Sequence, residues 1–123
     1  MLKLLLLSLP LVAASPMPEL DARAPPSAPA GWKSHGCHFD CYDGMNRYLP
    51  HFAYSSNRNS PRKCTKACAA AGYKFAGVQF GKECWCGNEI GGQLTDDSEC
   101  FVKCPKSRGT CGGPCRNFIY GLA

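Results

Sequence analysis

Cysteine is the residue type in this sequence with the most chemistry to offer. The stretch GKECWCGN, residues 81–88, holds two cysteines two positions apart, with Trp85 between them. Such a pair could supply a nucleophile, two metal ligands or halves of two disulfides. Metal sites usually combine Cys-x-x-Cys pairs with reducing conditions, so the choice depends on the compartment. The chain has ten cysteines, at positions 37, 41, 64, 68, 84, 86, 100, 104, 111 and 115.

The beginning of the chain predicts export. Lys3 precedes an apolar run, and the small residues up to Ala14 form a cleavage pattern. Residues 1–14 are therefore predicted to be a secretory signal peptide that is cut after Ala14. Residues 15–30, rich in Pro, Ala and Ser, are predicted to be a linker or pro-segment, and residues 31–123 one domain. We expect a secreted protein, extracellular or cell-wall associated, without a transmembrane segment. In that setting an even number of cysteines predicts a disulfide framework.

Local signals predict the elements that position the cysteines. Ser60 is a good N-cap, Pro61 suits the first helical position and Gly72 is a typical stop, so a helix is expected between them. The following run, residues 73–88, has strand composition, with turn-like glycines at 81 and 87. Residues 117–121 are a further short strand candidate, whereas residues 42–59 are expected to be an irregular surface segment. The expected core residues are Trp32, Tyr73, Phe75, Val78 and Phe80.

The spacing of four cysteines suits a clamp between helix and strand. Cys64 and Cys68 share a helix face, about 6 Å apart along the axis. Cys84 and Cys86 share a strand face, about 6.6 Å apart. Because the two spacings match, two parallel disulfides could join the elements, and Trp85 would point away from them. Spacing alone does not choose between the pairings 64–84 with 68–86 and 64–86 with 68–84.

Other residues that could do chemistry lack the partners they need. His35, His38 and Asp40 lie close in sequence but have no fourth metal ligand at sensible spacing. The acidic residues within 96–99 could be paired carboxylates for sugar hydrolysis, but their pattern favours a solvated turn. No serine lies in a nucleophile-elbow sequence. We therefore expect neither an enzyme nor a metal or other cofactor.

Aromatic and amide side chains predict sugar binding instead. Aromatic rings pack on the C–H faces of sugars, while amides and carboxylates bond the hydroxyls. Trp85 could be such a platform or could cover a minor core, and the sequence leaves both interpretations open. The candidate carbohydrate-binding residues are Trp85, Tyr42, Tyr48, Tyr54 and Asn57. Phe52 is a further aromatic residue of the same irregular segment.

The chain is moderately basic, with a formal net charge of +5. This charge suits attraction to acidic polysaccharides or membranes, and we expect no nucleic-acid partner. Arg62 and Lys63 fall in the first turn of the expected helix, where the helix dipole disfavours cations. With Arg58 and Lys66 they form a basic cluster, which is either a solvated face or an anion-binding site.

Three motifs together resemble the WSC domain. They are W-x-x-x-G-C from Trp32, C-x-x-x-C-x-x-x-G-Y-x-x-x-G-V-x-x-G-x-E-C-W-C-G-N from Cys64, and C-x-x-x-C followed by T-C-G-G from Cys100. The resemblance implies a compact, disulfide-rich α+β fold of the kringle or PAN-like kind, with one helix on a small antiparallel sheet. It also implies four disulfides: Cys37–Cys100, Cys64–Cys84, Cys68–Cys86 and Cys104–Cys111.

Two cysteines, Cys41 and Cys115, exceed the eight that the WSC domain usually has. We predict that they bond to each other and tie the start of the domain to its end.

The resemblance also implies a function. WSC domains are carbohydrate-binding modules, typically of fungal proteins, so we expect a secreted lectin-like protein that binds cell-wall polysaccharide such as β-glucan. The alternative is a secreted protein-interaction factor, an effector or inhibitor, on the same scaffold. The sequence does not indicate an oligomeric state.

Overall fold

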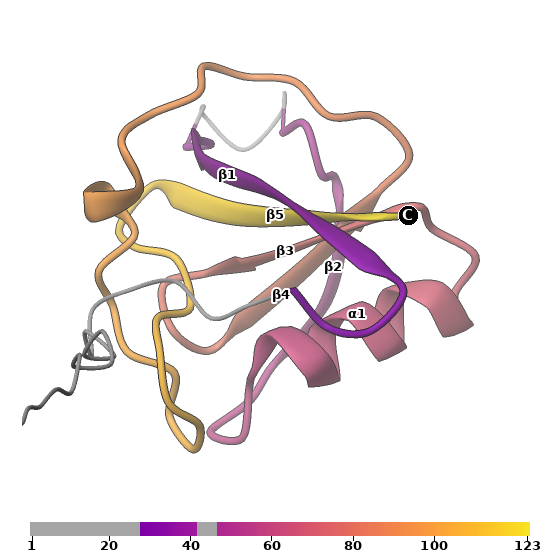
Figure 1. Ribbon diagram of the computed structural model, residues 1–123, viewed down its shortest axis with the longest axis horizontal. Coiled ribbons are helices and arrows are strands. Elements are labelled where there is room, and N and C mark those ends of the chain that lie inside the picture. The colour runs from indigo at the N-terminus through magenta and orange to yellow at the C-terminus, as the bar shows by residue number, and fades with distance from the viewer. Residues whose placement is uncertain (1–27, 42–46) are drawn as a thin grey trace, which may run out of the picture.

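The computed structural model describes residues 28–41 and 47–123. The predicted signal peptide, most of the predicted linker and Tyr42 lie outside the described residues. Within them, one α-helix packs on a five-stranded sheet whose neighbouring strands are all antiparallel (Figure 1). This disulfide-rich α+β architecture confirms the predicted fold class. The elements are β1 (Trp32–Phe39), β2 (His51–Ser55), α1 (Pro61–Ala70), β3 (Phe75–Gln79), β4 (Glu83–Gly87), the 3-10 turn η1 (Asp97–Glu99) and β5 (Arg116–Leu122).

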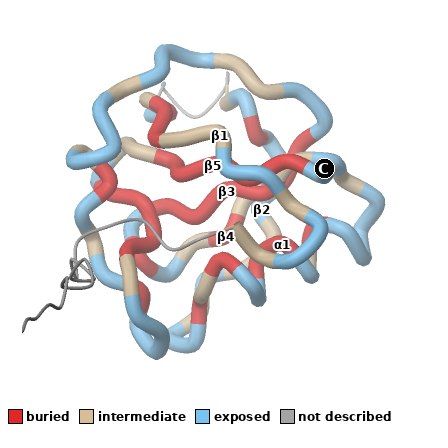
Figure 2. The backbone as a smooth tube through the Cα atoms, in the orientation of Figure 1, coloured by how far each residue is buried: buried red, intermediate tan, exposed pale blue. Residues whose placement is uncertain are grey.

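The strand order, β1-β5-β3-β4-β2, brings the two ends of the domain together. The last strand, β5, pairs with β1 on one side and β3 on the other, so Phe118 lies opposite both Cys37 and Val78. Figure 2 shows that these central strands are largely buried, whereas the connecting loops are exposed. The edges of the sheet are β1 and β2.

Helix α1 forms where local chemistry predicted it. The Ser60 hydroxyl caps the helix by accepting a hydrogen bond from the Lys63 amide at 3.0 Å, and Pro61 occupies the first turn. Gly72 follows the end of the helix with φ +88°, a backbone conformation that glycine adopts without strain.

Strands β3 and β4 form a tight hairpin, in which Gln79 pairs with Glu83. Gly81 takes φ +83° in the turn, as a turn glycine should. Phe80 also has a positive φ, and its side chain is 57% exposed. The prediction that Phe80 belongs to the core is therefore wrong, because the turn directs it into solvent. Gly87, the other glycine that was predicted to be turn-like, is the last residue of β4.

The prediction of an irregular segment at residues 42–59 is wrong for β2. His51 pairs with Cys86 and Ser55 with Glu83, so this polar stretch adds an edge strand to β4. Hydrogen bonds from β4 decide its conformation, and these are not visible in local composition. Strand β5 is likewise longer than the predicted 117–121, because it pairs on both sides.

The hydrophobic core lies between the sheet and α1. Val78 is fully buried there, and Trp32 and Tyr73 pack half-buried at its rim, as predicted. Phe75 is half-buried and meets the ring of His35 edge-on, with centroids 5.7 Å apart. The buried residues of the core cluster are Cys37, Cys64, Cys68, Ala76, Val78, Cys84, Cys86, Cys100, Cys104, Cys111, Phe118 and Tyr120.

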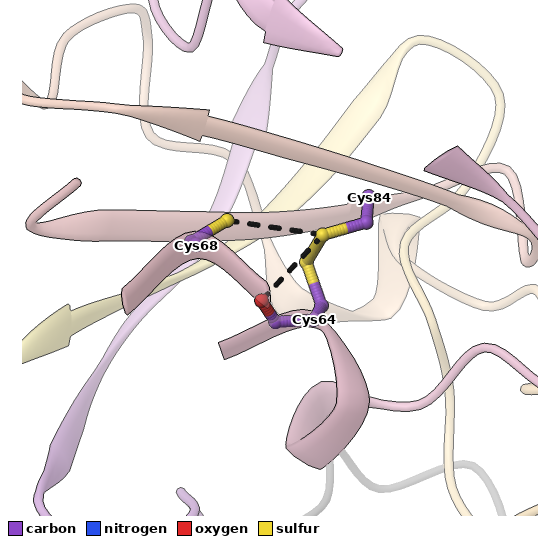
Figure 3. A group of neighbouring side chains, drawn as sticks. All are labelled: Cys64, Cys68 and Cys84. Atoms are coloured by element: carbon purple, nitrogen blue, oxygen red, sulfur yellow. Dashed lines mark hydrogen bonds between the residues drawn. A yellow bond between two sulfur atoms is a disulfide. The ribbon is translucent and has the colours of Figure 1, made fainter. Parts of the chain in front are cut away.

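Two adjacent disulfides join α1 to β4. Cys64–Cys84 and Cys68–Cys86 both have Cα–Cα distances of 5.4 Å, so the structure has the pairing that the resemblance implied. Figure 3 shows the Cys64–Cys84 bond with the Cys68 side chain beside it. The sulfurs of Cys68 and Cys84 lie 3.8 Å apart. Disulfide sulfurs carry no proton, so this is a packing contact. Cys64, Cys68 and Cys84 are also the one cluster of metal-ligand atoms found among the described residues, but bonded sulfurs are not thiolate ligands.

Three further disulfides complete the framework. Cys37–Cys100 and Cys104–Cys111 match the resemblance, and Cys41 is bonded to Cys115. No free cysteine occurs in the described part of the chain. The last disulfide joins the segment after β1 to the segment before β5, across a sequence separation of 74.

Candidate functional site

The sheet face opposite α1 is covered by a loop rather than by a helix. Leu49 is fully buried there. It lies directly over the backbone of Gly77 and Gly87, where an added Cβ would come within 2.6 Å and 2.9 Å of Leu49 methyl groups. The two glycines therefore let the loop approach the sheet closely, which explains the glycine within β3 and the one at the end of β4.

A buried polar cluster fixes this loop beside the sheet. Arg47 donates to the Asp40 carboxylate at 3.3 Å and to the side-chain oxygen of Gln79 at 2.6 Å. The Asn117 amide donates to the same Asp40 oxygen at 3.1 Å. Asp40, Gln79 and Asn117 are each at most 4% exposed, so the guanidinium of Arg47 is held by a rigid frame.

Arg47 stacks on Trp85. Its guanidinium carbon lies 3.4 Å from the centroid of the indole ring, a close cation–π contact. Phe52 meets Trp85 edge-on, with centroids 5.0 Å apart, and the indole N–H donates to the Glu83 carboxylate at 3.0 Å. Phe52 remains 48% exposed. We call Arg47, Phe52, Glu83 and Trp85 the Trp85 patch.

The remaining candidate sugar-binding residues that the structure describes come from separate segments. Tyr48 is 40% exposed, and its ring lies against Gly91 and Gly92. Asn57 is exposed in the turn before α1. Tyr42 lies outside the described residues.

Tyr54 faces α1, on the opposite side of the sheet from Trp85. It pairs with Cys84, whose side chain points to the helix, and the Lys63 ammonium lies 5.1 Å from its ring centroid. Its hydroxyl donates to the side-chain oxygen of Asn59 at 2.5 Å, and burial raises the pKa of Tyr54 well above its ordinary value. Asn59 in turn donates to the Gly81 carbonyl at 2.9 Å. Tyr54 thus joins β2 to the β3–β4 turn through Asn59.

Replacing Tyr54 with phenylalanine should lower the free energy of unfolding by about 1–2 kcal/mol, because the buried Asn59 oxygen loses its donor. Urea unfolding would measure the change. The matched control is Tyr73→Phe: Tyr73 is also half-buried, but its hydroxyl has no hydrogen bond among the described residues, so we expect little change. Equal losses for the two variants would contradict the assignment.

The histidines and acids considered for chemistry each have a structural contact. The pKa of His35 is lowered, and burial is the largest cause. Its ring packs on Phe75. The His38 ring nitrogen Nδ1 lies 3.2 Å from the Gly36 carbonyl. Asp97 accepts a hydrogen bond from the backbone of Cys37 at 3.2 Å, and Glu99 forms an ion pair with Arg116 at 2.7 Å. Among the described residues, the cluster of potential metal ligands that the structure contains does not include any of these side chains.

Sequence reasoning missed Arg47 and Glu83 as members of the Trp85 patch. Glu83 could have been found, because residues two apart on a strand share a face and Trp85 lies two positions away. Arg47 carries no such signal, since only the folded loop brings it over the indole.

The fold and its disulfides define a small disulfide-rich module in which covalent bonds supplement a modest core. The model of the WSC domain family matches residues 34–113, and the chain belongs to this family. Strand β5 lies beyond the matched stretch, although it is central to the sheet. None of the helices among the described residues has the length and apolar character needed to cross a membrane.

Curated relatives share only this module. Xylosyltransferase oxt of Drosophila melanogaster is 39% identical over 93 residues, which cover 71% of this chain and 11% of the relative. A WSC domain-containing protein of Arthroderma benhamiae is 32% identical over 98 residues, 75% of this chain and 10% of the relative. Xylosyltransferase sqv-6 of Caenorhabditis elegans is 37% identical over 84 residues, 63% of this chain and 10% of the relative. The chain thus spans about a tenth of the length of these relatives. They come from two animals and one fungus, so the comparisons do not show the predicted fungal origin.

Proposed function

We propose that the chain is a non-catalytic carbohydrate-binding module that recognises cell-wall polysaccharide, foremost β-glucan, through the Trp85 patch. The observation that carries this proposal is the contact between the exposed Phe52 ring and Trp85, with Arg47 and Glu83 beside them. An apolar surface flanked by a few fixed polar groups is the usual composition of a small-ligand site.

Each group of the patch has a task in sugar binding. The Phe52 ring and the accessible part of Trp85 would pack against the C–H face of a glucose unit. The Glu83 carboxylate would accept a hydrogen bond from a sugar hydroxyl, and Arg47 would donate one. Because Arg47 is already fixed by Asp40 and Gln79, little side-chain entropy is lost on binding.

The comparisons support a module that accompanies carbohydrate chemistry without performing it. The relatives named xylosyltransferase match this chain over only about a tenth of their length. The five disulfides further support secretion, extracellular or to the cell wall, because such a framework persists in oxidising compartments.

Substituting Phe52 or Trp85 with alanine should weaken binding to insoluble β-1,3-glucan roughly tenfold, as for a central aromatic contact. Depletion of the oxidised protein from solution, with soluble β-1,3-glucan oligosaccharide as competitor, measures the effect. Phe101→Ala is the matched control, because Phe101 is 55% exposed and lies outside the patch. Tyr54→Phe should also bind normally, since Tyr54 faces α1.

Two results would contradict the proposal. One is the absence of competable depletion on β-1,3-glucan, β-1,6-glucan, xylan and chitin while all disulfides are intact. The other is an equal loss for Phe101→Ala and Phe52→Ala, which would indicate non-specific adsorption of aromatic surface. Retention by a protein ligand in place of a polysaccharide would favour the protein-interaction alternative.

A further inference from the structure

A hollow lies at the start of α1, away from the Trp85 patch. It is lined by the chain entering β1, the first turns of α1 and the loop around Arg108, and it encloses about 670 Å³. These segments lie close together in Figure 1 although they are far apart in the sequence. We call this site the basic groove and define it by Trp32, Arg62, Lys66 and Arg108.

The charge of the basic groove is of one sign. Arg62, Lys66 and Arg108 all line it and are exposed, and no Asp or Glu is among its lining residues. None of the three cations forms an ion pair within the described part of the chain. Three cations around one hollow repel one another, and Arg62 additionally lies in the first helical turn, which has no acidic residue. An anion in the groove would relieve both effects.

Trp32 adds an aromatic surface to this charge. Its side chain is half-buried, with one part packed against the core cluster while another lines the groove. A small inorganic anion has no apolar surface that could pack on an indole ring, whereas the C–H face of a sugar ring does.

The walls of the groove are rigid. Helix α1 is bonded to β4 by the Cys64–Cys84 and Cys68–Cys86 disulfides. The loop that carries Arg108 is closed by Cys104–Cys111, across a separation of only seven residues. The cations therefore project from a preformed frame, which lowers the entropy lost on binding.

We propose that the basic groove binds an anionic saccharide, with a sugar ring on Trp32 and carboxylate or sulfate groups between Arg62, Lys66 and Arg108. The guanidinium groups suit such planar or multi-oxygen acids because they donate paired hydrogen bonds. The groove lies on the α1 side of the sheet and Trp85 on the other. The assignment is thus independent of neutral-glucan binding at the Trp85 patch.

The test compares two double variants that each remove two positive charges. Arg62→Gln with Arg108→Gln alters the groove, and Lys74→Gln with Lys82→Gln alters exposed lysines elsewhere. Binding is titrated with polygalacturonate, dextran sulfate, neutral soluble β-1,3-glucan and phosphatidylserine vesicles, in low salt and again in about 0.5 M NaCl. Polygalacturonate and dextran sulfate distinguish a carboxylate from a sulfate ligand.

We expect the wild type to bind at least one acidic polymer in low salt and to lose affinity in high salt. The groove variant should bind it roughly tenfold more weakly than the lysine control does, while both keep any binding to neutral glucan. Equal weakening of the two variants would overturn the proposal, because it would show attraction by net charge alone. Failure to bind either acidic polymer would also overturn it. So would groove-dependent binding only to phosphatidylserine vesicles, which would assign the surface to membranes.

Discussion

Removing the Cys37–Cys100 disulfide, by replacing both cysteines with alanine, should lower the free energy of unfolding by about 3 kcal/mol. With Cys41–Cys115 and Cys104–Cys111 still bonded, the shortest path along the chain from Cys37 to Cys100 covers about a dozen residues, and closing this loop restricts the unfolded chain. It also joins β1, an edge strand, to the segment after η1. Urea unfolding of the oxidised protein would measure the loss, and mass spectrometry of non-reduced peptides would verify the remaining bonds.

The matched control is removal of Cys104–Cys111, which is also buried but spans seven residues. Loop-closure entropy predicts a smaller loss there, about 2 kcal/mol. Both double variants delete a buried pair of sulfurs, so the difference between them isolates loop length. Equal losses, or a larger loss for Cys104–Cys111, would show that local packing and not loop length sets the contribution of each bond.

The substitution Gly112→Ala should lower the free energy of unfolding by about 3 kcal/mol or more, because it adds overpacking to backbone strain. Gly112 has φ +77°, and an added Cβ would overlap the Val78 carbonyl oxygen and lie 2.7 Å from that of Arg116. Those are backbone atoms of β3 and β5, so neither can move aside without opening the sheet. Thermal and urea unfolding would measure the loss.

Gly72→Ala separates the two causes. Gly72 has nearly the same backbone angle, φ +88°, but an added Cβ would meet nothing within 4 Å. Only the strain of a positive φ remains, about 1 kcal/mol. If both variants lost the same stability, the close approach at Gly112 would have no energetic consequence and the explanation would fail.

Much of the framework could be predicted from the sequence. The cap at Ser60, the proline after it and Gly72 set the limits of α1 through contacts within the helix itself. The equal spacing of the cysteines on helix and strand predicted a double clamp, because period 3.6 and period 2 are properties of the local backbone. The choice between its two pairings came only from the resemblance to a family, and β2 was missed because β4 supplies its hydrogen bonds.

The candidate site depends on tertiary structure more than the helix and the disulfide framework do. Phe52 and Tyr54 lie two apart on β2, and simple alternation would put them on one face. Phe52 pairs with Trp85, whereas Tyr54 pairs with Cys84, so β2 has one residue more than β4 between these pairs. This irregularity turns the two rings to opposite faces of the sheet.

The sequence by itself thus determined the helix and the cysteine clamp, because local periodicity and capping encode them. The family followed from three motifs that resemble the WSC domain. Only the tertiary structure decided which aromatic rings meet and which cations share a groove. Register between strands and the approach of distant loops depend on contacts that no local pattern specifies. Trp85, between its two cysteines, shows both: alternation aims it away from the disulfides, and the folded loop then lays Arg47 across its ring.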